Sequence, residues 1–394
     1  MISNHLDKLK LAIGKATCVK KQIGKGYWRQ LWDIVRLPGR SPSCNVWDYY
    51  DFRLYDEDFV APDTLVEFAG SSIQEDISQA LNPRSIAAPG WDKLVCMAIL
   101  RGEAFTFSKL KAVYRPRGGI PSYVPCALTS SDETMRFLRN RSNYPMFTKP
   151  SYGQGGVGSF LLSDYDTQSD RIKHSNGTSE LVQDFVGRVL FQTASPFHQV
   201  ESGYLFQDVV DQHHAINEFQ GRDAVSGLRV VVLNDPAGPK VLLVTWKLAM
   251  GSNVTDNFTL GAYGNLVARV NQETGAADFA VNAMWPTAER LYKHPVTGKS
   301  FASFKIPFWR EALETATAAA RFFPLMRIQH WDVAVTNAGP ELLELNELGG
   351  TQIHQMGGQG ILTHELREFI LAYGNLDKRP LLREACLAGR TAKG

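Results

Sequence analysis

Short apolar segments rich in valine and leucine recur in the second half of the chain, and near the C-terminus apolar and polar residues alternate. This period of two is typical of strands that bury one face. The clearest predicted strands cover residues 228–233, 240–250 and 266–270. The alternation covers residues 331–346, where the central Asn337-Ala338-Gly339-Pro340 supplies turn chemistry. The pattern therefore predicts a sheet that includes a β-hairpin near the C-terminus.

Other segments repeat apolar residues at the spacing of a helix. One covers residues 94–100, and another follows Ser179, a suitable N-cap, with its apolar residues on one face: Leu181, Val182, Phe185, Val186, Val189 and Leu190. After Pro307, the residues that recur at this spacing, which we expect in the core, are Trp309, Leu313, Ala316, Ala320 and Phe323. We predict an α+β protein with a mainly helical region at 1–90 and two further parts at 91–202 and 203–394.

The predicted hairpin carries three oxygen-bearing side chains. Glu344 and Asn346 share one face of the returning strand, and Asp332 lies on the first strand. If the loop holds an odd number of residues, for example 337–339 with Gly339 left-handed, Asp332 falls opposite Glu344 on that face, whereas an even loop turns it away. Two carboxylates and an amide suit Mg²⁺, which completes its octahedron with water and phosphate oxygens. The alternative is a surface hairpin whose acidic residues face water.

A glycine-rich segment provides a second candidate site. Gly153, Gly155 and Gly158 match the G-x-G-x-x-G pattern of dinucleotide-binding folds, and Gly156 lies between them. In those folds a helix must follow the glycines, but here residues 157–162 form a β-type run. The pattern therefore predicts strand, glycine-rich loop and strand.

Such a loop can act as a flap. Without Cβ atoms, the backbone N–H groups of Gly153, Gly155 and Gly156 can approach phosphates closely. Lys149 on the incoming strand would reach a phosphate as a point charge. The alternative is a flexible glycine hairpin with a surface lysine.

Together these features resemble the ATP-grasp superfamily, in which two α+β lobes close on ATP. The similarity is closest to its sugar-transfer-associated or glutamate-ligase-related branch and spans roughly residues 45 to 375. Further segments fit this resemblance in order: 49–55, 91–94, 203–213, 228–233, 243–248, 256–258 and 294–298.

The resemblance implies roles for several residues. Lys93 would be the second nucleotide lysine, and adenine would be held by the hinge residues Gln207, Asp208, Val209 and Val210. The residues expected near the γ-phosphate or the acceptor are Arg229, Lys247 and Asn257. Lys247 replaces a more frequent arginine, and His330 stands where related amide ligases carry an arginine, so we expect Arg229 to steer the phosphate. For Asn257 the alternative is a polar turn.

Composition is that of an ordinary globular protein. The 394 residues are 44% hydrophobic and 21% charged, and the formal net charge of +2 is too small for a dedicated nucleic-acid binder. The five cysteines show no C-x-x-C spacing, so we expect reduced thiols in a cytoplasmic protein. We also expect no integral membrane contact, because no apolar run approaches the length of a bilayer span.

The first 40 residues are basic, and Trp28 and Trp32 stand four residues apart. The segment could be a helix for a membrane surface or an acidic partner. We favour a solvated helix that docks its tryptophans on the first domain.

We predict an ATP-dependent carboxylate–amine ligase that uses ATP and Mg²⁺ and forms an amide or peptide bond through an acyl phosphate. Asp332, Glu344 and Asn346 would hold the metal. Its partners would be a small-molecule carboxylate and an amine, and the sequence leaves a homo-oligomer open. One alternative is a small-molecule kinase with the same ATP and metal residues. Another is a nucleotide-sensing or scaffold protein with an idle site.

Overall fold

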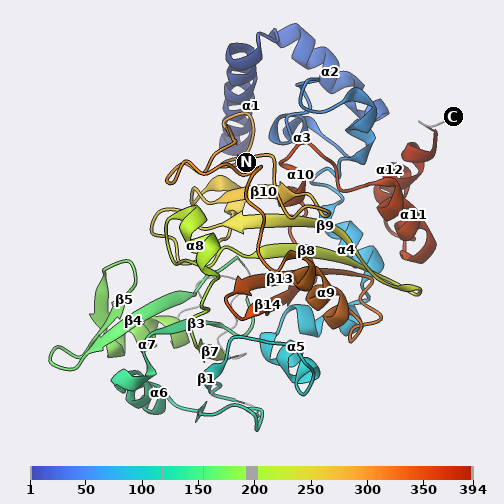
Figure 1. The fold of residues 1–394 in the computed structure, drawn as a ribbon. Coiled ribbons are helices and arrows are strands. Elements are labelled where there is room, and N and C mark those ends of the chain that lie inside the picture. Colours follow the sequence, from blue (N-terminus) through green and yellow to red (C-terminus); the bar gives the residue numbers. More distant parts are fainter. Residues whose placement is uncertain (1, 118, 154, 192–202, 392–394) are drawn as a thin grey trace.

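The computed structural model describes residues 2–117, 119–153, 155–191 and 203–391, and its strands form two sheets, a mixed one that contains β1 to β7 and an antiparallel one that contains β8 to β14 (Figure 1). The smaller part of the molecule contains the sheet with strand order β2-β1-β7-β3-β4-β5-β6. Its strands are β1 (Leu110–Tyr114), β2 (Ala127–Leu128), β3 (Met146–Pro150), β4 (Phe160–Asp166), β5 (Arg171–His174), β6 (Ser179–Leu181) and β7 (Tyr204–Gln207).

The larger sheet has the order β12-β11-β10-β9-β8-β13-β14. Its strands are β8 (Leu228–Asp235), β9 (Gly238–Leu248), β10 (Leu266–Val270), β11 (Ala280–Val281), β12 (Arg290–Leu291), β13 (Ile328–Thr336) and β14 (Gly339–Asn346). All four strand predictions, including the C-terminal hairpin, are confirmed within a few residues.

Helices precede, link and cover the sheets. They are α1 (Ile2–Ile23), α2 (Tyr27–Arg40), α3 (Val46–Asp51), α4 (Gln74–Leu81), α5 (Lys93–Leu100), α6 (Ser131–Leu138), α7 (Val182–Phe191), α8 (His214–Gln220), α9 (Trp309–Ala320), α10 (Gln352–Gln355), α11 (His364–Tyr373) and α12 (Pro380–Thr391). Short 3-10 turns are η1 (Pro62–Glu67), η2 (Arg84–Ile86), η3 (Ala88–Gly90), η4 (Arg141–Asn143) and η6 (Thr259–Gly261). The predicted α+β class with N-terminal helices is confirmed.

The larger sheet is buried on both faces. Val230 and Val232 of β8 pack in the cluster that contains the alanines of α9, whereas Val231 and Leu233 pack with α4, α11 and α12. A strand covered on both faces needs apolar residues at successive positions, which explains the apolar run from Val230 to Leu233 in β8. The strands of the larger sheet are therefore held in place from both sides.

The predicted division at 1–90, 91–202 and 203–394 stays a prediction, although two contacts bear on it. The boundary at 202 lies outside the described residues, and β7 just after it pairs with β1 and β3 of the smaller sheet. Ile73 and Ile77, from the N-terminal part, share a core cluster with the larger sheet.

Two local predictions are wrong. Ser179 does not cap a helix, because Ser179–Leu181 pairs with β5 as strand β6, and α7 starts at Val182. Tertiary pairing here overrides local helical spacing, and Leu181 is left exposed. Trp28 and Trp32 do not dock on the first domain: both are exposed on α2, whose buried side carries Gln30 and Leu37.

Among the described residues, no helix is long and apolar enough to cross a bilayer. The five cysteines are free in this structure.

Close backbone packing at Gly70 holds two segments of the N-terminal region together. A Cβ on Gly70 would lie 1.9 Å from the carbonyl oxygen of Ser43, and the Ser43 hydroxyl accepts a hydrogen bond from the Gly70 N–H (3.1 Å). We predict that Gly70→Ala lowers the free energy of unfolding by about 3 kcal/mol, because backbone atoms cannot move aside cheaply.

The matched control is Gly14→Ala in α1, where no atom lies within 4 Å of the added Cβ. It should raise stability by about 0.5–1 kcal/mol through helix propensity. Chemical denaturation of the two variants checks the pair, and equal effects would contradict the packing at Gly70.

Candidate active site

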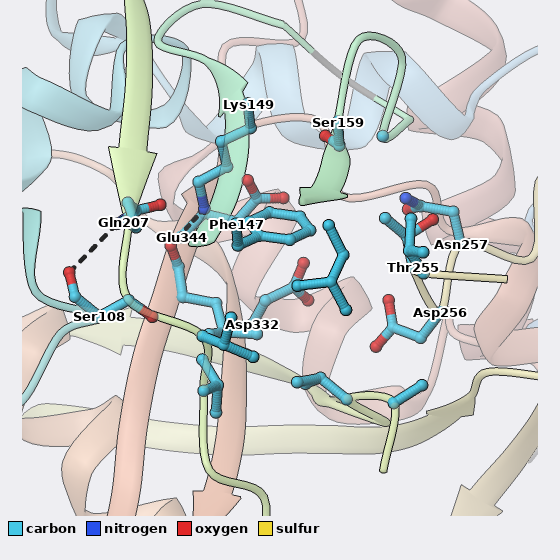
Figure 2. A pocket seen from close by; sticks show the side chains of 18 of the residues that line it. Ser108, Phe147, Lys149, Ser159, Gln207, Thr255, Asp256, Asn257, Asp332 and Glu344 are labelled. Atoms are coloured by element: carbon cyan, nitrogen blue, oxygen red, sulfur yellow. Dashed lines mark hydrogen bonds between the residues drawn. The ribbon is translucent and has the colours of Figure 1, made fainter. Parts of the chain in front are cut away.

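A cavity of about 460 Å³ lies where the smaller sheet, the larger sheet and α5 meet. Its wall includes Lys149 on β3, the segment after β7, the loop before η6, and the hairpin of β13 and β14. Figure 2 shows Lys149 pointing from its strand toward Glu344, with Asp332 beside it and Thr255, Asp256 and Asn257 on the other side. The size is typical of a small-molecule site.

The hairpin brings Asp332 opposite Glu344, as predicted, but by a different route. The loop is even, since Thr336 pairs with Gly339 and only Asn337 and Ala338 lie between them. The expected three-residue loop is therefore wrong. The register shifts by one residue between the Val333–Leu342 and Asp332–Glu344 pairs, so Leu343 is the extra residue of a β-bulge. The extra residue offsets the even number of loop residues, so both carboxylates lie on one face of the hairpin.

Asp332 is buried and fully engaged. Arg229 donates to both of its oxygens (Nε–Oδ1 2.5 Å, Nη2–Oδ2 2.8 Å), and Lys247 lies 3.2 Å from Oδ2. Burial opposes its ionisation, but Arg229 and Lys247 hold the pKa of Asp332 well below its usual range. The aspartate therefore stays charged.

Arg229 does not line the cavity, contrary to the phosphate-steering role expected for it. Its remaining Nη1 group donates to the carbonyl oxygen of Gly349 (2.6 Å), so the guanidinium is held behind Asp332. Lys247 does line the cavity and also donates to Asp256 (3.1 Å). Lys247 is thus the basic group that this strand pair presents to a ligand.

Asn346 lies between the two hairpin carboxylates. Its Nδ2 is 3.4 Å from Asp332 Oδ2 and 3.5 Å from Glu344 Oε1. Rotation of the amide by 180° would turn its carbonyl oxygen toward the same gap between the carboxylates. The three predicted metal ligands are therefore brought together, although Asn346 does not reach the cavity wall.

Glu344 is balanced by two lysines. Its Oε2 lies 3.4 Å from Nζ of Lys93, the first residue of α5. Burial disfavours the charged carboxylate, but Lys93 and Lys149 lower the pKa of Glu344 overall. Lys93 also donates to the carbonyl oxygen of Gly153 (3.2 Å) and so connects the glycine-rich segment to the hairpin.

Lys149 is half-buried in the cavity wall. Strand β3 buries Met146, Thr148 and Pro150, and the alternate residues Phe147 and Lys149 face the cavity. The Lys149 ammonium donates to the carbonyl oxygen of the bulge residue Leu343 (3.5 Å). Burial lowers the pKa of Lys149 to about 8.

The glycine-rich segment forms a loop between β3 and β4, with no helix after it, as predicted. Gly155 and Gly156 have φ of 69° and 72°, a region that favours glycine. A Cβ on Gly156 would lie 2.4 Å from Nδ2 of Asn257, so this loop packs directly against the predicted substrate loop. Gly153, Gly155, Gly156 and Asn257 all line the cavity.

The predicted hinge residues form the opposite end of the cavity. Gln207 at the end of β7 is buried and donates to the carbonyl oxygen of Ser108 (3.1 Å), and the three residues after it line the same wall: Asp208, Val209 and Val210. Asp208 pairs with Lys111 (2.8 Å). This end is largely apolar, because Phe147 and Leu343 also lie there.

Three contributors were missed from the sequence. Phe147 could have been found, because it shares the face of Lys149 by strand alternation. The bulge at Leu343 and the carbonyl of Gly349 could not, because both depend on backbone geometry. His330 is fully buried, does not line the cavity, and its ring fills the space where a Cβ on Gly349 would lie (2.1 Å).

Residues 72–370 match the protein family described as sugar-transfer associated ATP-grasp. The match covers well over half of the chain. The chain belongs to this family. The resemblance and the ATP-grasp fold predicted from the hairpin and glycine loop are therefore confirmed.

Solved structures similar to this ATP-grasp protein include ligases of low sequence identity. An L-amino acid ligase from Bacillus licheniformis is 13% identical with a TM-score of 0.37, over 67% of this chain and 44% of that one. A D-alanine-D-alanine ligase from Coxiella burnetii is 9% identical with a TM-score of 0.38, over 82% and 65%.

A third similar structure is an ADP complex of N5-carboxyaminoimidazole ribonucleotide synthetase. It is 10% identical with a TM-score of 0.37, over 70% of this chain and 52% of that one. The ATP-grasp chain thus spans about half to two thirds of the lengths of these three proteins. No curated protein matches it.

The lowered pKa of Lys149 predicts unusual reactivity of this amine. A neutral amine reacts with acylating or aldehyde reagents, so labelling of Lys149 should rise and then level off above about pH 8. Lys240, which is exposed, is the reference lysine, and its labelling rate is measured in the same samples. Mass spectrometry of labelled peptides from about pH 7 to about pH 10 measures both rates. A Lys149 rate that rises in parallel with that of Lys240 across this range would contradict the assignment.

Proposed function

We propose that this ATP-grasp protein is an ATP-dependent ligase that joins a carboxylate to an amine through an acyl phosphate, with release of ADP and phosphate. The observation that carries the proposal is the meeting of Asp332 and Glu344 beside three lysines in one cavity, with Asn346 between the two carboxylates. Family membership and the ligases among the similar structures agree with it.

The residues that line the cavity favour one orientation of a bound nucleotide. Adenine would lie at the apolar end between Phe147 and Leu343, with the backbone of residues 207–210 reading its edge. The phosphates would then extend toward Lys93 and Lys149, beneath the glycine-rich loop. Lysines bind phosphate oxygens as point charges, and backbone N–H groups of the glycines can approach closely.

The charge balance favours a metal that arrives with the nucleotide. Three carboxylates, Asp332, Glu344 and Asp256, are already paired with basic side chains. Their partners Arg229, Lys247 and Lys93, with Lys149 beside them, already balance these charges, so a bare divalent cation would have to compete with basic groups that a polyphosphate can use. Among the described residues, no three His, Cys, Asp or Glu side chains gather as a metal site.

Mg²⁺ nevertheless fits the hairpin when it is bound to ATP. Asp332 and Glu344 supply two carboxylates, Asn346 lies between them, and phosphate oxygens and water would complete the octahedron. When bound, Mg²⁺ neutralises charge on the phosphate oxygens during transfer. Arg229 acts here as a positioning residue, because it fixes both oxygens of Asp332 from behind.

Lys247 is the group proposed to meet the transferred phosphoryl. Its ammonium lies between Asp332 and Asp256, and burial disfavours its charge while these two carboxylates raise its pKa overall. It therefore stays protonated and can stabilise the charge on the phosphoryl oxygens. Asn257, packed against Gly156, is the proposed acceptor contact because it lies where the glycine loop would close.

The alternative is a kinase that phosphorylates a hydroxyl, which benefits from a free carboxylate base beside the acceptor. Asp256 is a candidate for this base because it lines the cavity beside Lys247. Its Oδ2 accepts the Gly227 N–H (2.8 Å) and its Oδ1 accepts from Lys247 (3.1 Å), so both oxygens are engaged. This arrangement favours the ligase, in which a carboxylate acceptor needs no base.

The first test of this function uses thermal denaturation. Mg·ATP should raise Tm by several degrees through binding to the folded state, roughly as expected at a hundredfold excess over Kd. Mg²⁺ alone and NAD should leave Tm unchanged. Glu344→Gln keeps the shape but removes a metal ligand, so the fold should persist while affinity for Mg·ATP falls roughly 10- to 100-fold.

Glu365→Gln, at an exposed site on α11, is the matched control and should behave as the wild type. Stabilisation by NAD but not by ATP would instead indicate that the glycine-rich segment binds a dinucleotide. If Mg·ATP raises the Tm of Glu344→Gln as much as that of the wild type, Glu344 does not bind the metal.

The second test follows the phosphoryl group. With a cognate acid and amine, ADP and inorganic phosphate should appear in equal amounts. Hydroxylamine in place of the amine should trap the acyl phosphate as a hydroxamate, because an acyl phosphate is a strong electrophile. Phosphate release and hydroxamate colour measure the two products. A stable phosphate ester with neither product would support the kinase.

A further inference from the structure

The outward face of α2 is apolar. Trp28 is 84% exposed, Trp32 56% and Val35 65%, and Leu31 is half exposed between them. These residues follow the i, i+3, i+4, i+7 spacing of one helix face. The opposite side of α2 packs on the protein through Gln30 and Leu37. A surface helix of a globular protein normally turns its apolar stripe inward, so the outward stripe needs a separate explanation.

Arginines border this stripe on one side. At 100° per residue, Arg29, Arg36 and Arg40 lie within about 40° of one another, between the exposed stripe and the buried side. The Arg36 guanidinium lies over the Trp32 ring, 4.2 Å from its centroid. The helix thus has an apolar surface with a basic border.

Helix α1 continues the same surface. Leu6, Leu9 and Ile13 are each more than half exposed and share one face of α1. Thr17, one turn after Ile13, lies 3.1 Å from the hydroxyl of Tyr27, the first residue of α2. The stripe of α1 therefore adjoins that of α2 at Tyr27. We call the joint surface, formed by Leu6, Leu9, Ile13, Trp28, Leu31, Trp32 and Val35, the N-terminal face.

The N-terminal face is remote from the candidate active site. Figure 1 shows α1 and α2 at one end of the molecule and the smaller sheet at the other, with the larger sheet between them. None of the seven residues lines the cavity. The surface therefore has no evident part in nucleotide binding.

Positive charge is concentrated at this end. The first 40 residues contain nine Lys and Arg against two Asp, whereas the whole chain carries only +2, so the remainder is net negative. Such a distribution would orient the N-terminal face toward an anionic surface. Tryptophan prefers the boundary between headgroups and acyl chains, where its ring is buried and its N–H stays hydrated.

We propose that the N-terminal face docks the protein on an anionic phospholipid bilayer, with α2 lying in the plane of the headgroups. Trp28, Leu31, Trp32 and Val35 enter the acyl boundary, and the arginines bind lipid phosphates. A second copy of the chain fits this surface less well. Two copies joined through this face would bring their arginine borders together, whereas homodimer interfaces bury apolar cores depleted in charge.

Vesicle co-sedimentation of the full chain tests the proposal. The protein should sediment with vesicles of phosphatidylcholine and phosphatidylglycerol, only weakly with phosphatidylcholine alone, and less in high salt. Trp28→Ala with Trp32→Ala should lower the partition coefficient at least roughly tenfold, because two interfacial anchors are lost. Leu325→Ala, at an exposed leucine elsewhere, is the matched control and should bind as the wild type.

A second variant separates docking from folding. Arg29→Gln with Arg36→Gln changes exposed side chains only and should weaken binding to anionic vesicles, while the Tm of the protein stays unchanged. Sedimentation equilibrium without vesicles measures self-association in parallel. The proposal is overturned if the wild type ignores anionic vesicles, if the tryptophan variant binds as well as the wild type, or if the variant instead converts a dimer to monomers.

Discussion

The site depends on the burial of a charged aspartate. Asp332 lies on a strand buried on both faces, where an unpaired carboxylate is very unfavourable. Arg229 from the neighbouring strand β8 and Lys247 from β9, the next strand along, therefore contact it from within the same sheet. This requirement accounts for several other features. It fixes the guanidinium of Arg229, draws in the carbonyl of Gly349, and leaves Lys247 shared with Asp256.

The two sheets meet through long basic side chains rather than through an apolar interface alone. Lys93 from α5 contacts both Glu344 of the larger sheet and the Gly153 carbonyl of the glycine loop. Lys149 from the smaller sheet reaches the carbonyl of Leu343. These contacts are long and exchangeable, so phosphate oxygens can replace them at modest cost. The resting molecule is thus held together at its cavity by the same groups that a polyphosphate would use.

The sequence was most informative where chemistry follows strand periodicity. Alternation alone placed Glu344 with Asn346, and the β-type run after Gly158 correctly excluded the helix of a dinucleotide site. It failed where backbone geometry or tertiary pairing decides. The withdrawal of Arg229 behind Asp332 depends on how three strands align, and the strand at Ser179 depends on pairing with β5. The docking predicted for Trp28 and Trp32 was wrong, because an apolar stripe along a helix does not show whether it faces the protein or the solvent.

The bulge at Leu343 has a consequence for how related sequences should be aligned. Because successive side chains of a strand point to opposite faces, loss of one residue between Asp332 and Glu344 would turn the glutamate into the core unless the bulge disappeared with it. Insertions or deletions of two residues at the hairpin tip would preserve the facing. Whether the number of residues between Asp332 and Glu344 is odd or even therefore indicates whether the bulge is present. An alignment gap of odd length in this interval predicts that a homologue has gained or lost the bulge, even where no residue identity is shared.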